Sequence, residues 1–445
     1  MKPVLRFRTL ICVAPSRIST GTLAINVRRD KLLKRSIIIV SIVALAASAQ
    51  AQDKTFSLTG ILSGRSVRAT GQPSWLDGGF GRLDFGGPGV DQSRTVSQAV
   101  GQLGVDWKPS RFFDLHADGL ARTRPSGYGG KSSGVVQAYA DIRFPIGSVD
   151  EIQLRAGQFF LPTSRENRGD LWSSPYTINF SAINTWIGQE VRPVGLDLQW
   201  KRGFYFTFGA TAFKNNDTMG TLLAWRGWTV GNRLSVYDEV LPLPPISSLT
   251  KTDFFGLQRP DGTRPFESDL DGRIGFSGRV RFAVPERGLI QITHLDNRGD
   301  HLRHVGEYSW ATRYNQVGAE LGNPEATILA AEWISGQTAM GRLDRAHVDV
   351  DFRSAYVLLS HKMGRTRFSI RGDTFGTDDE VHAASDAFGE HGHAWTAAWL
   401  FDLSSSVRTA LELTTITGNR QAAADSGFNP NAKGRTLTAE VRYKF

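Results

Sequence analysis

The sequence GRTLTAEVRYKF, residues 434–445, alternates strictly between polar and apolar side chains from residue 436 onward. One face would carry Leu437, Ala439, Val441, Tyr443 and Phe445, and the other would carry Thr436, Thr438, Glu440, Arg442 and Lys444. A period of two is the signature of a β-strand whose two faces have different surroundings. An aromatic strand at the edge of a soluble sheet invites aggregation, and a closed barrel removes that edge. The stretch therefore predicts the closing strand of a β-barrel, paired with the first strand.

The same alternation recurs along the chain after residue 52. Clear examples are residues 136–144, 152–156, 194–201, 204–208, 274–282 and 395–403. The polar face of these stretches repeatedly carries full charges, such as Asp141 and Arg143. A soluble sandwich and a membrane barrel can both produce this alternation, so the lengths of the connections must separate the two classes.

Short and long connections take turns between the expected strands. The short ones lie near residues 108–110, 145–150, 202–203, 285–288, 322–325, 362–365 and 404–406, and the long ones near 66–94, 123–133, 162–190, 214–271, 299–306, 338–346, 377–392 and 418–433. Seven turns and eight loops join 16 strands, with 18 as the alternative count. Short turns, long external loops and an even strand number are the anatomy of outer-membrane barrels. The sequence therefore predicts an all-β fold, a transmembrane antiparallel β-barrel of about 16 strands.

Residues 1–51 contain the three parts of a secretory signal peptide in order. Residues 31–35 are positively charged, residues 37–47 are apolar, and residues 49–51 form a small-x-small cleavage site. We therefore expect residues 1–51 to be a leader that is removed near Ala51/Gln52, and residues 52–445 to form the barrel. An exported chain with this fold is expected in the bacterial outer membrane, in contact with its lipid.

The net charge of +9 has its origin in the leader rather than in the predicted barrel. Residues 1–51 hold nine of the 52 Lys and Arg residues and one of the 43 Asp and Glu residues, which leaves 43 basic and 42 acidic residues. The remainder is nearly neutral, so the high isoelectric point gives no reason to expect a nucleic-acid partner. The single cysteine, Cys12, also lies in the leader, which excludes a disulfide framework from the predicted barrel.

Three stretches resemble the phosphate-selective porin family: RAGQFFLP at 155–162, VGAEL at 317–321 and the terminal residues 438–445. Members of that family are trimeric, 16-stranded outer-membrane channels. The resemblance implies a homotrimer, a loop near 162–190 folded into the lumen, and small anions such as phosphate among the solutes. It also implies that Tyr443 and Phe445 belong to an assembly signal for the barrel-assembly machinery.

The sequence departs from the family pattern at the constricting loop. The family's phosphate site is associated with lysines, but no lysine occurs here between Lys131 and Lys201. Residues 162–190 offer Arg165 and Arg168 instead. Arginine binds oxyanions through two parallel N–H donors, where lysine acts as a point charge. Anion binding is therefore predicted on arginine side chains.

Strand parity and loop position nominate eleven arginines as lining a pore. The candidates are Arg143, Arg155, Arg165, Arg168, Arg273, Arg279, Arg281, Arg353, Arg371, Arg408 and Arg442. Rings of Arg or Lys in a pore favour anions. Acids of similar number share the inward parity, so the clustering of charges at the narrowest point decides the preference. Arg273, Arg279 and Arg281 form the best local ladder, because no acid shares their face of that stretch.

Together, these patterns predict a porin through which small ions or polar nutrients diffuse passively, without enzymatic activity. No residue is assigned a catalytic, cofactor-binding or metal-binding role. Two alternatives stay open. One is an adhesin-type barrel that acts through its loops, mainly 214–271, and the other is an enzymatic barrel with a catalytic constellation.

Overall fold

The computed structural model describes residues 55–124, 128–250, 255, 258, 261–266, 269–342, 344, 347–379 and 388–445. The predicted leader, residues 1–51, and its cleavage site lie outside the described residues. Within the described ranges, no helix is both long enough and apolar enough to cross a membrane.

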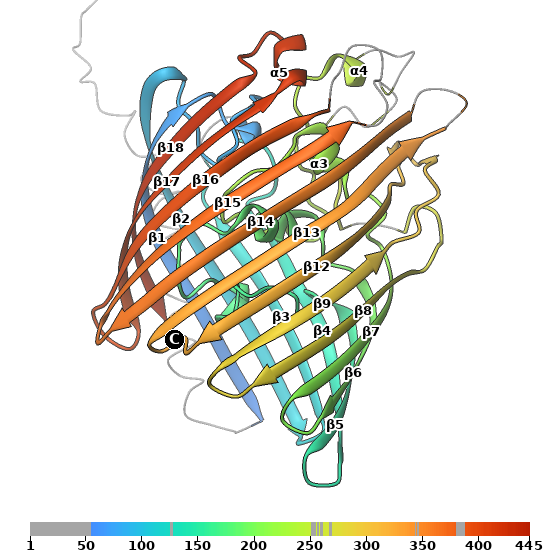
Figure 1. Cartoon of the computed structure of the whole chain (residues 1–445), viewed down its shortest axis with the longest axis vertical. Helices are drawn as coiled ribbons and strands as arrows, with labels where there is room; N and C mark the ends of the chain where they lie inside the picture. The colour runs from blue at the N-terminus through green and yellow to red at the C-terminus, as the bar shows by residue number, and fades with distance from the viewer. Residues whose placement is uncertain are drawn as a thin grey trace, which may run out of the picture. The chain divides into compact units, whose positions relative to one another are not determined.

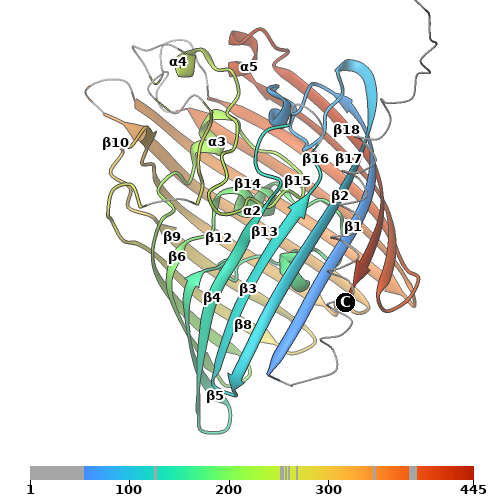
Figure 2. The same cartoon turned by 180° about the vertical axis from the view of Figure 1, so that it is seen from behind.

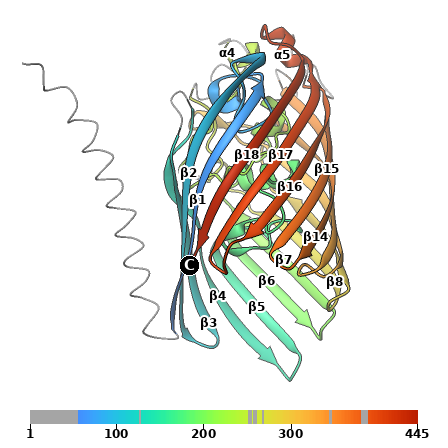
Figure 3. The same cartoon turned by 90° about the vertical axis from the view of Figure 1, so that its left-hand side faces the viewer.

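Sixteen antiparallel strands form one closed barrel. In chain order they are β1 (Phe56–Gly71), β2 (Gly89–Ser110), β3 (Phe113–Arg122), β4 (Ser133–Ile146), β5 (Asp150–Gln158), β6 (Val194–Arg202), β7 (Phe206–Lys214), β8 (Gly275–Val284), β9 (Gly288–Asp296), β12 (Ala311–Gly322), β13 (Thr327–Gly341), β14 (His347–Met363), β15 (Thr366–Asp379), β16 (Glu390–Asp402), β17 (Val407–Arg420) and β18 (Asn431–Lys444). Strand β18 closes the ring by pairing with both β17 and β1 (Figure 3). The predicted fold class and strand number are confirmed.

Two further strands, β10 (Arg303–His304) and β11 (Glu307–Tyr308), pair only with each other. They form a small hairpin in the connection between β9 and β12, so they do not add to the barrel. The connection lengths follow the predicted alternation. Seven connections, such as 111–112 and 364–365, are two to four residues long, and Figure 1 shows the tight turns at the lower end of the barrel.

The two faces of each strand differ as the alternation predicted. In β18, Glu440 and Arg442 are buried, whereas Leu437 is 43% exposed and Val441 is 55% exposed. Apolar side chains on the outside and polar ones inside are the arrangement of a barrel that meets lipid. Trp395 on β16 follows the same pattern, because this large apolar side chain is exposed on the outer face of the barrel.

Short helical segments lie in the long connections. They are η1 (Trp75–Asp77), η2 (Asp170–Trp172), α2 (Ala182–Glu190), α3 (Thr221–Trp225), α4 (Ser247–Thr250) and α5 (Gln421–Asp425). Figures 1 and 2 show α2 and α3 inside the ring of strands. We call residues 159–193, between β5 and β6, the inner loop, and residues 215–274, between β7 and β8, the second loop.

The inner loop fills part of the barrel with an apolar core. All nine residues of α2 are buried, and its Trp186 ring packs at 5.6 Å from Tyr314 and 5.5 Å from Phe352, measured between ring centroids. The loop expected near 162–190 is therefore folded into the barrel. The second loop joins the same core, because Trp228 packs 6.0 Å from Trp186.

Candidate functional site

A buried arginine anchors the inner loop to the barrel wall. Arg371 on β15 is fully buried, and its Nε donates to Asp373 Oδ2 on the same strand at 2.9 Å. Its η nitrogens donate to the carboxylate of Glu166 and to the backbone oxygens of Asn179 and Phe180, the last two at 2.8 Å. This predicted pore-lining residue is thus used to hold the inner loop.

Two buried glutamates of the wall fix the inner loop at other points. The backbone N–H of Asn179 donates to Glu412 Oε1 on β17 at 2.9 Å. The Asn184 side-chain amide donates to Glu332 Oε1 on β13 at 3.2 Å, and the backbone N–H of Arg165 donates to the same oxygen. These contacts attach the inner loop to β13 and β17.

The second loop corrects a prediction, because 214–271 was expected to be external. The described residues around α3 lie inside the barrel instead. Trp228 Nε1 donates to the backbone oxygen of Gly376 at 3.1 Å, and Arg420 Nη2 donates to that of Trp225 at 3.1 Å. Both tryptophans of this loop, Trp225 and Trp228, are fully buried, and burying large aromatic surface stabilises this inward conformation.

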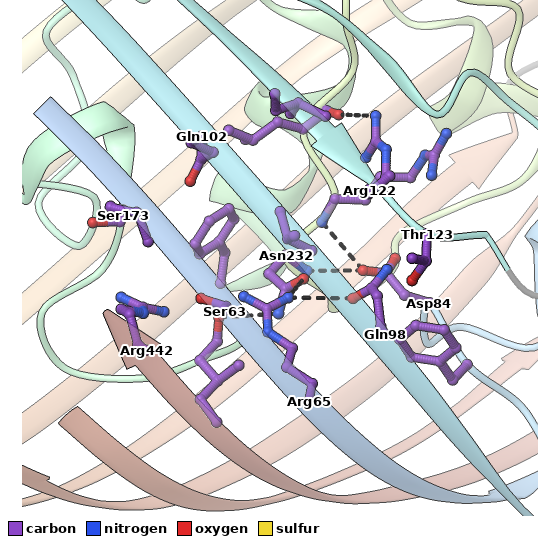
Figure 4. Close-up of a pocket in the computed structure, with 18 of the residues that line it drawn as sticks. Ser63, Arg65, Asp84, Gln98, Gln102, Arg122, Thr123, Ser173, Asn232 and Arg442 are labelled. Atoms are coloured by element: carbon purple, nitrogen blue, oxygen red, sulfur yellow. Dashed lines mark hydrogen bonds between the residues drawn. The ribbon is translucent and has the colours of Figure 1, made fainter. Parts of the chain in front are cut away.

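A cavity of about 60 Å³ lies between the inner loop and the wall formed by β1, β2 and β3. Its charged and amide lining residues are Arg65, Asp84, Gln98, Gln102, Arg122, Arg124, Asn232, Arg233 and Arg442. Five of these are arginines and one is an acid. Figure 4 shows Arg442, Arg65 and Arg122 spaced along the cavity. We call this space the β1–β3 cavity.

Where β1 and β18 border the cavity, two arginines share the carboxylate of Glu440. Arg65 Nε donates to Glu440 Oε2 at 2.6 Å, and Arg442 Nε donates to Glu440 Oε1 at 2.9 Å. Arg65 also donates from Nη1 to the Asn232 side-chain oxygen at 2.8 Å (Figure 4). The three charged groups carry one net positive charge, which favours an anion in the adjacent space.

The same two-to-one pattern recurs at the next level. Glu239 is fully buried and accepts from Arg122 Nη2 at 3.4 Å and from Arg233 Nη2. Asp84 accepts from the backbone N–H groups of Asn232 and Arg233 at 2.9 and 3.2 Å. Burial raises the pKa of Asp84. Counted together, five arginines line the β1–β3 cavity against three carboxylates, those of Asp84, Glu239 and Glu440, so the cations are in excess.

Most sequence-predicted arginines are paired with acids, several of them on neighbouring strands. Arg143 lies 2.6 Å from Asp114, and Arg155 donates to Asp141 at 2.8 Å. Pairing of this kind fixes the wall and leaves little net charge for selecting ions. Arg408 likewise pairs with Asp402 at 2.7 Å, on the two sides of a short turn.

The expected ladder of Arg273, Arg279 and Arg281 is corrected by the structure. Arg279 Nη2 reaches Asp197 Oδ1 on β6 at 2.6 Å, passing over Gly209, where a Cβ atom would lie 2.6 Å from Nη2. The sequence argument considered only acids on the same strand. Arg273 precedes β8, is exposed, and donates to the backbone oxygen of a loop residue.

Arg281 differs from these paired residues. Its side chain makes no ion pair or hydrogen bond within the described part of the chain, and its Nε is buried. The charged groups that act on it are Arg165, Glu320 and Arg168. Arg165 and Arg168 both pair with Glu320, so Arg281 lies near a carboxylate that is already paired with two other cations.

Arg353 is on the opposite face from the one predicted. The inward face of β14 is formed by Phe352, Ser354 and Tyr356, which are buried, whereas Arg353 is exposed and pairs with Asp378 at 2.7 Å. The prediction placed the charged face of this strand, with Arg353, toward the lumen. Here the inward positions pack against the loops and are largely apolar.

A cluster of three carboxylates lies where the second loop meets β7 and β8. Oxygens of Asp217, Asp269 and Asp271 lie within 4.8 Å of one another. Burial, together with the two neighbouring carboxylates, raises the pKa of Asp217 to about 6. Lys214 Nζ lies 2.7 Å from Asp269 Oδ2 and neutralises part of the charge. The cluster brings together the two ends of the second loop, one after β7 and one before β8.

Of the five arginines that line the β1–β3 cavity, only Arg442 was predicted from the sequence. Arg65 and Arg122 share the predicted inward parity of their strands, so parity alone could have found them. Asp84, Asn232 and Arg233 lie in loops without a periodic pattern, and only the tertiary fold brings them to the wall.

Comparisons with known proteins give the fold. No protein-family model matches the sequence, and no curated protein matches it. The outer membrane channel DcaP of Acinetobacter baumannii superposes with a TM-score of 0.53 at 10% identity, over 88% of this chain and 97% of that chain. The anion-selective porin from Comamonas acidovorans gives 0.50 at 12% identity, over 88% and 99%. Salmonella typhi OmpF, in a complex with daunomycin, gives 0.50 at 11% identity, over 88% and 97%. At these identities the similarity establishes the barrel fold.

Proposed function

We propose that this protein is a porin of the bacterial outer membrane through which small hydrophilic solutes diffuse passively, with a preference for anions such as phosphate. The observation that carries the proposal is the charge of the β1–β3 cavity. Two arginines accompany one carboxylate at the level of Glu440 and again at the level of Glu239. A low-dielectric passage lined by one sign of charge concentrates the opposite ion.

Passage in this proposal needs no chemistry from the protein. An anion enters beside Arg122 and Arg233, moves along the wall past Arg65, and leaves past Arg442. Each cation is held by a carboxylate or an amide, so its position is fixed while the anion exchanges its own hydration for N–H donors. Binding is spread over several levels, which allows release as well as entry.

The remaining parts of the proposal follow from the resemblance to phosphate-selective porins. We expect a homotrimer, insertion by the barrel-assembly machinery, and an assembly signal at Tyr443 and Phe445. The similarity of the fold to an anion-selective porin supports a channel role. The inward fold of the second loop argues against an adhesin that uses this loop as an external surface.

Planar-bilayer recording of the refolded protein tests the function. We expect single-channel steps in KCl and, across a KCl gradient, a reversal potential with the sign of a chloride-preferring channel. Absence of current would refute the porin. A reversal potential of the opposite sign would refute the anion preference while leaving the channel intact.

A further inference from the structure

The β1–β3 cavity has an apolar as well as a cationic lining. We propose that it favours organic anions with an apolar body, such as aromatic carboxylates, over small hydrophilic anions of the same charge. This inference rests on the proposed function and adds organic anions to its solute class, ahead of the small hydrophilic ones. The carboxylate would contact the arginines of the wall, and the ring would contact the inner loop.

The inner loop supplies much of the apolar lining. Trp172, Ile178 and Phe180 border the same cavity as Arg65 and Arg442. A small hydrated anion gains nothing from such groups and loses water beside them. An anion that also carries a ring gains free energy by removing its own apolar surface and that of the loop from water.

Trp172 is held in a conformation that the chain would not adopt without support. Leu171 and Trp172 have φ angles of 53° and 55°, so two consecutive non-glycine residues are left-handed. Such residues persist only where the surrounding structure enforces them, and they cluster at binding sites. Gln102 Nε2 donates to the backbone oxygen of Leu171 at 3.3 Å, and Asn167 Nδ2 donates to that of Trp172 at 2.9 Å. The wall and the loop together enforce the turn.

The same turn fixes the orientation of the indole ring. Trp172 stacks on Phe160 with 4.0 Å between centroids and an interplanar angle of 7°. Phe180 meets it edge-on at 5.5 Å. Phe160 is 4% exposed, but Trp172 is only half-buried, so one part of the indole faces the cavity. A rigid aromatic surface binds a ring with little loss of side-chain freedom.

The cation nearest to this end of the cavity has unused donors. Arg442 bonds through Nε to Glu440, and its two η nitrogens have no hydrogen-bond partner within the described residues. Figure 4 shows Arg442 beside Ser173, which follows Trp172 in the chain. A carboxylate can accept from both η nitrogens in the bidentate arrangement that arginine favours. The site thus offers a charged end and an aromatic end.

Bi-ionic reversal potentials of the full-length protein in bilayers test this inference, with potassium chloride, potassium acetate and potassium benzoate as probes. Acetate and benzoate share the carboxylate, and only benzoate carries a ring. We expect benzoate to be at least as permeant as acetate despite its larger size. Trp172→Ala should lower the benzoate-to-acetate permeability ratio roughly two- to tenfold, the range that one aromatic pair corresponds to.

Trp395→Ala is the matched control, because Trp395 is exposed on the outer face of β16, and it should leave the ratio unchanged. If Trp172→Ala does not form a heat-modifiable barrel, Trp172→Leu, which keeps apolar volume, should show the same loss. A wild-type ratio well below one, or a ratio that Trp172 variants do not change, would overturn the inference. Both results can occur with normal chloride selectivity, whereas loss of chloride current or its selectivity would refute the proposed function itself.

Discussion

Arg371 on β15 and Glu166 on the inner loop form an ion pair whose side chains are both fully buried inside the barrel. Removing Arg371 leaves the buried carboxylates of Glu166 and Asp373 without their cation in a low-dielectric interior. Destabilisation of about 3–5 kcal/mol is typical for that change. The pair therefore decides whether the inner loop stays docked.

Arg371→Ala should release the inner loop while the barrel strands stay paired. We expect faster amide exchange in residues 159–193 and noisier channel currents, with little change in strand exchange. Hydrogen-exchange mass spectrometry measures both regions in one sample. Arg353→Ala is the control, because its pair with Asp378 is exposed and surface pairs contribute about 0–1 kcal/mol. Equal exchange in both variants would contradict the anchoring role.

Arg281 and Arg279 lie two residues apart on β8 and should respond differently to mutation. Arg281→Ala removes a cation without an ion-pair partner, so the reversal potential should shift toward cations with little change in thermal stability. Arg279→Ala leaves Asp197 buried without its partner, so stability should fall by about 3–5 kcal/mol. Thermal unfolding of both variants, combined with bilayer recording, measures the difference. A larger loss of stability in Arg281→Ala would contradict the pairing described here.

Docking of the second loop on the inner loop should depend on pH through Glu190. Its carboxylate accepts from Trp186 Nε1 at 2.7 Å and from the backbone N–H of Leu222 at 2.8 Å. Burial outweighs these donors and raises the pKa of Glu190 from 4.5 to about 7. The folded state then holds the proton more tightly than the unfolded state. The proton bound to Glu190 stabilises the folded state fully below about pH 4.5, and this stabilisation is lost as the pH rises through about 7.

We therefore expect amide exchange around Leu222 to become faster between about pH 6 and 8, beyond the intrinsic effect of pH on exchange. The side chain that Glu190→Gln introduces cannot ionise, so the variant should lack this additional acceleration of exchange. The acceleration is measured by comparing the protection factors of the two proteins at matched pH. The same pH dependence in both proteins would show that another group controls the docking.

Phe445 should be needed to close the barrel efficiently. Its backbone N–H donates to Gly60 O at 3.1 Å, and Gly60 N donates back at 2.8 Å. The ring lies over Gly60, where a Cβ atom would be 2.1 Å from Phe445 Cζ. Phe445→Ala should lower the fraction of heat-modifiable barrel in the outer membrane. Phe144→Ala, which removes an exposed outward ring of β4, should have a smaller effect, and equal effects would contradict a special role for Phe445.

The strict period of two made the barrel predictable from the sequence, because lipid outside and polar groups inside impose it on most strands. The alternation of Leu437 and Val441 with Glu440 and Arg442 is a local property of the chain. Connection lengths then fixed the strand number. The same parity would have placed Arg65 and Arg122 in the lumen.

The charge balance of the lumen was less predictable. Asp197 neutralises Arg279 from two strands away, and no reading along β8 alone reveals that contact. Asp84 and Arg233 come from loops whose course depends on the burial of tryptophans such as Trp228. Parity also failed for Arg353, because the loops turn the inner face of β14 into an apolar packing surface.

Single cysteines locate the path of the solute most directly, since Cys12 is the only cysteine of the sequence and lies in the predicted leader. Gln98→Cys places a thiol in the β1–β3 cavity, Ser360→Cys places one on the fully buried inner face of β14, and Ser66→Cys places one on the outer face of β1. The measurement is channel current before and after a negatively charged methanethiosulfonate reagent. We predict that the current falls and the reversal potential shifts toward cations for Gln98→Cys alone. Unchanged current in Gln98→Cys, together with block in Ser360→Cys, would place the path in the other half of the barrel and contradict the account.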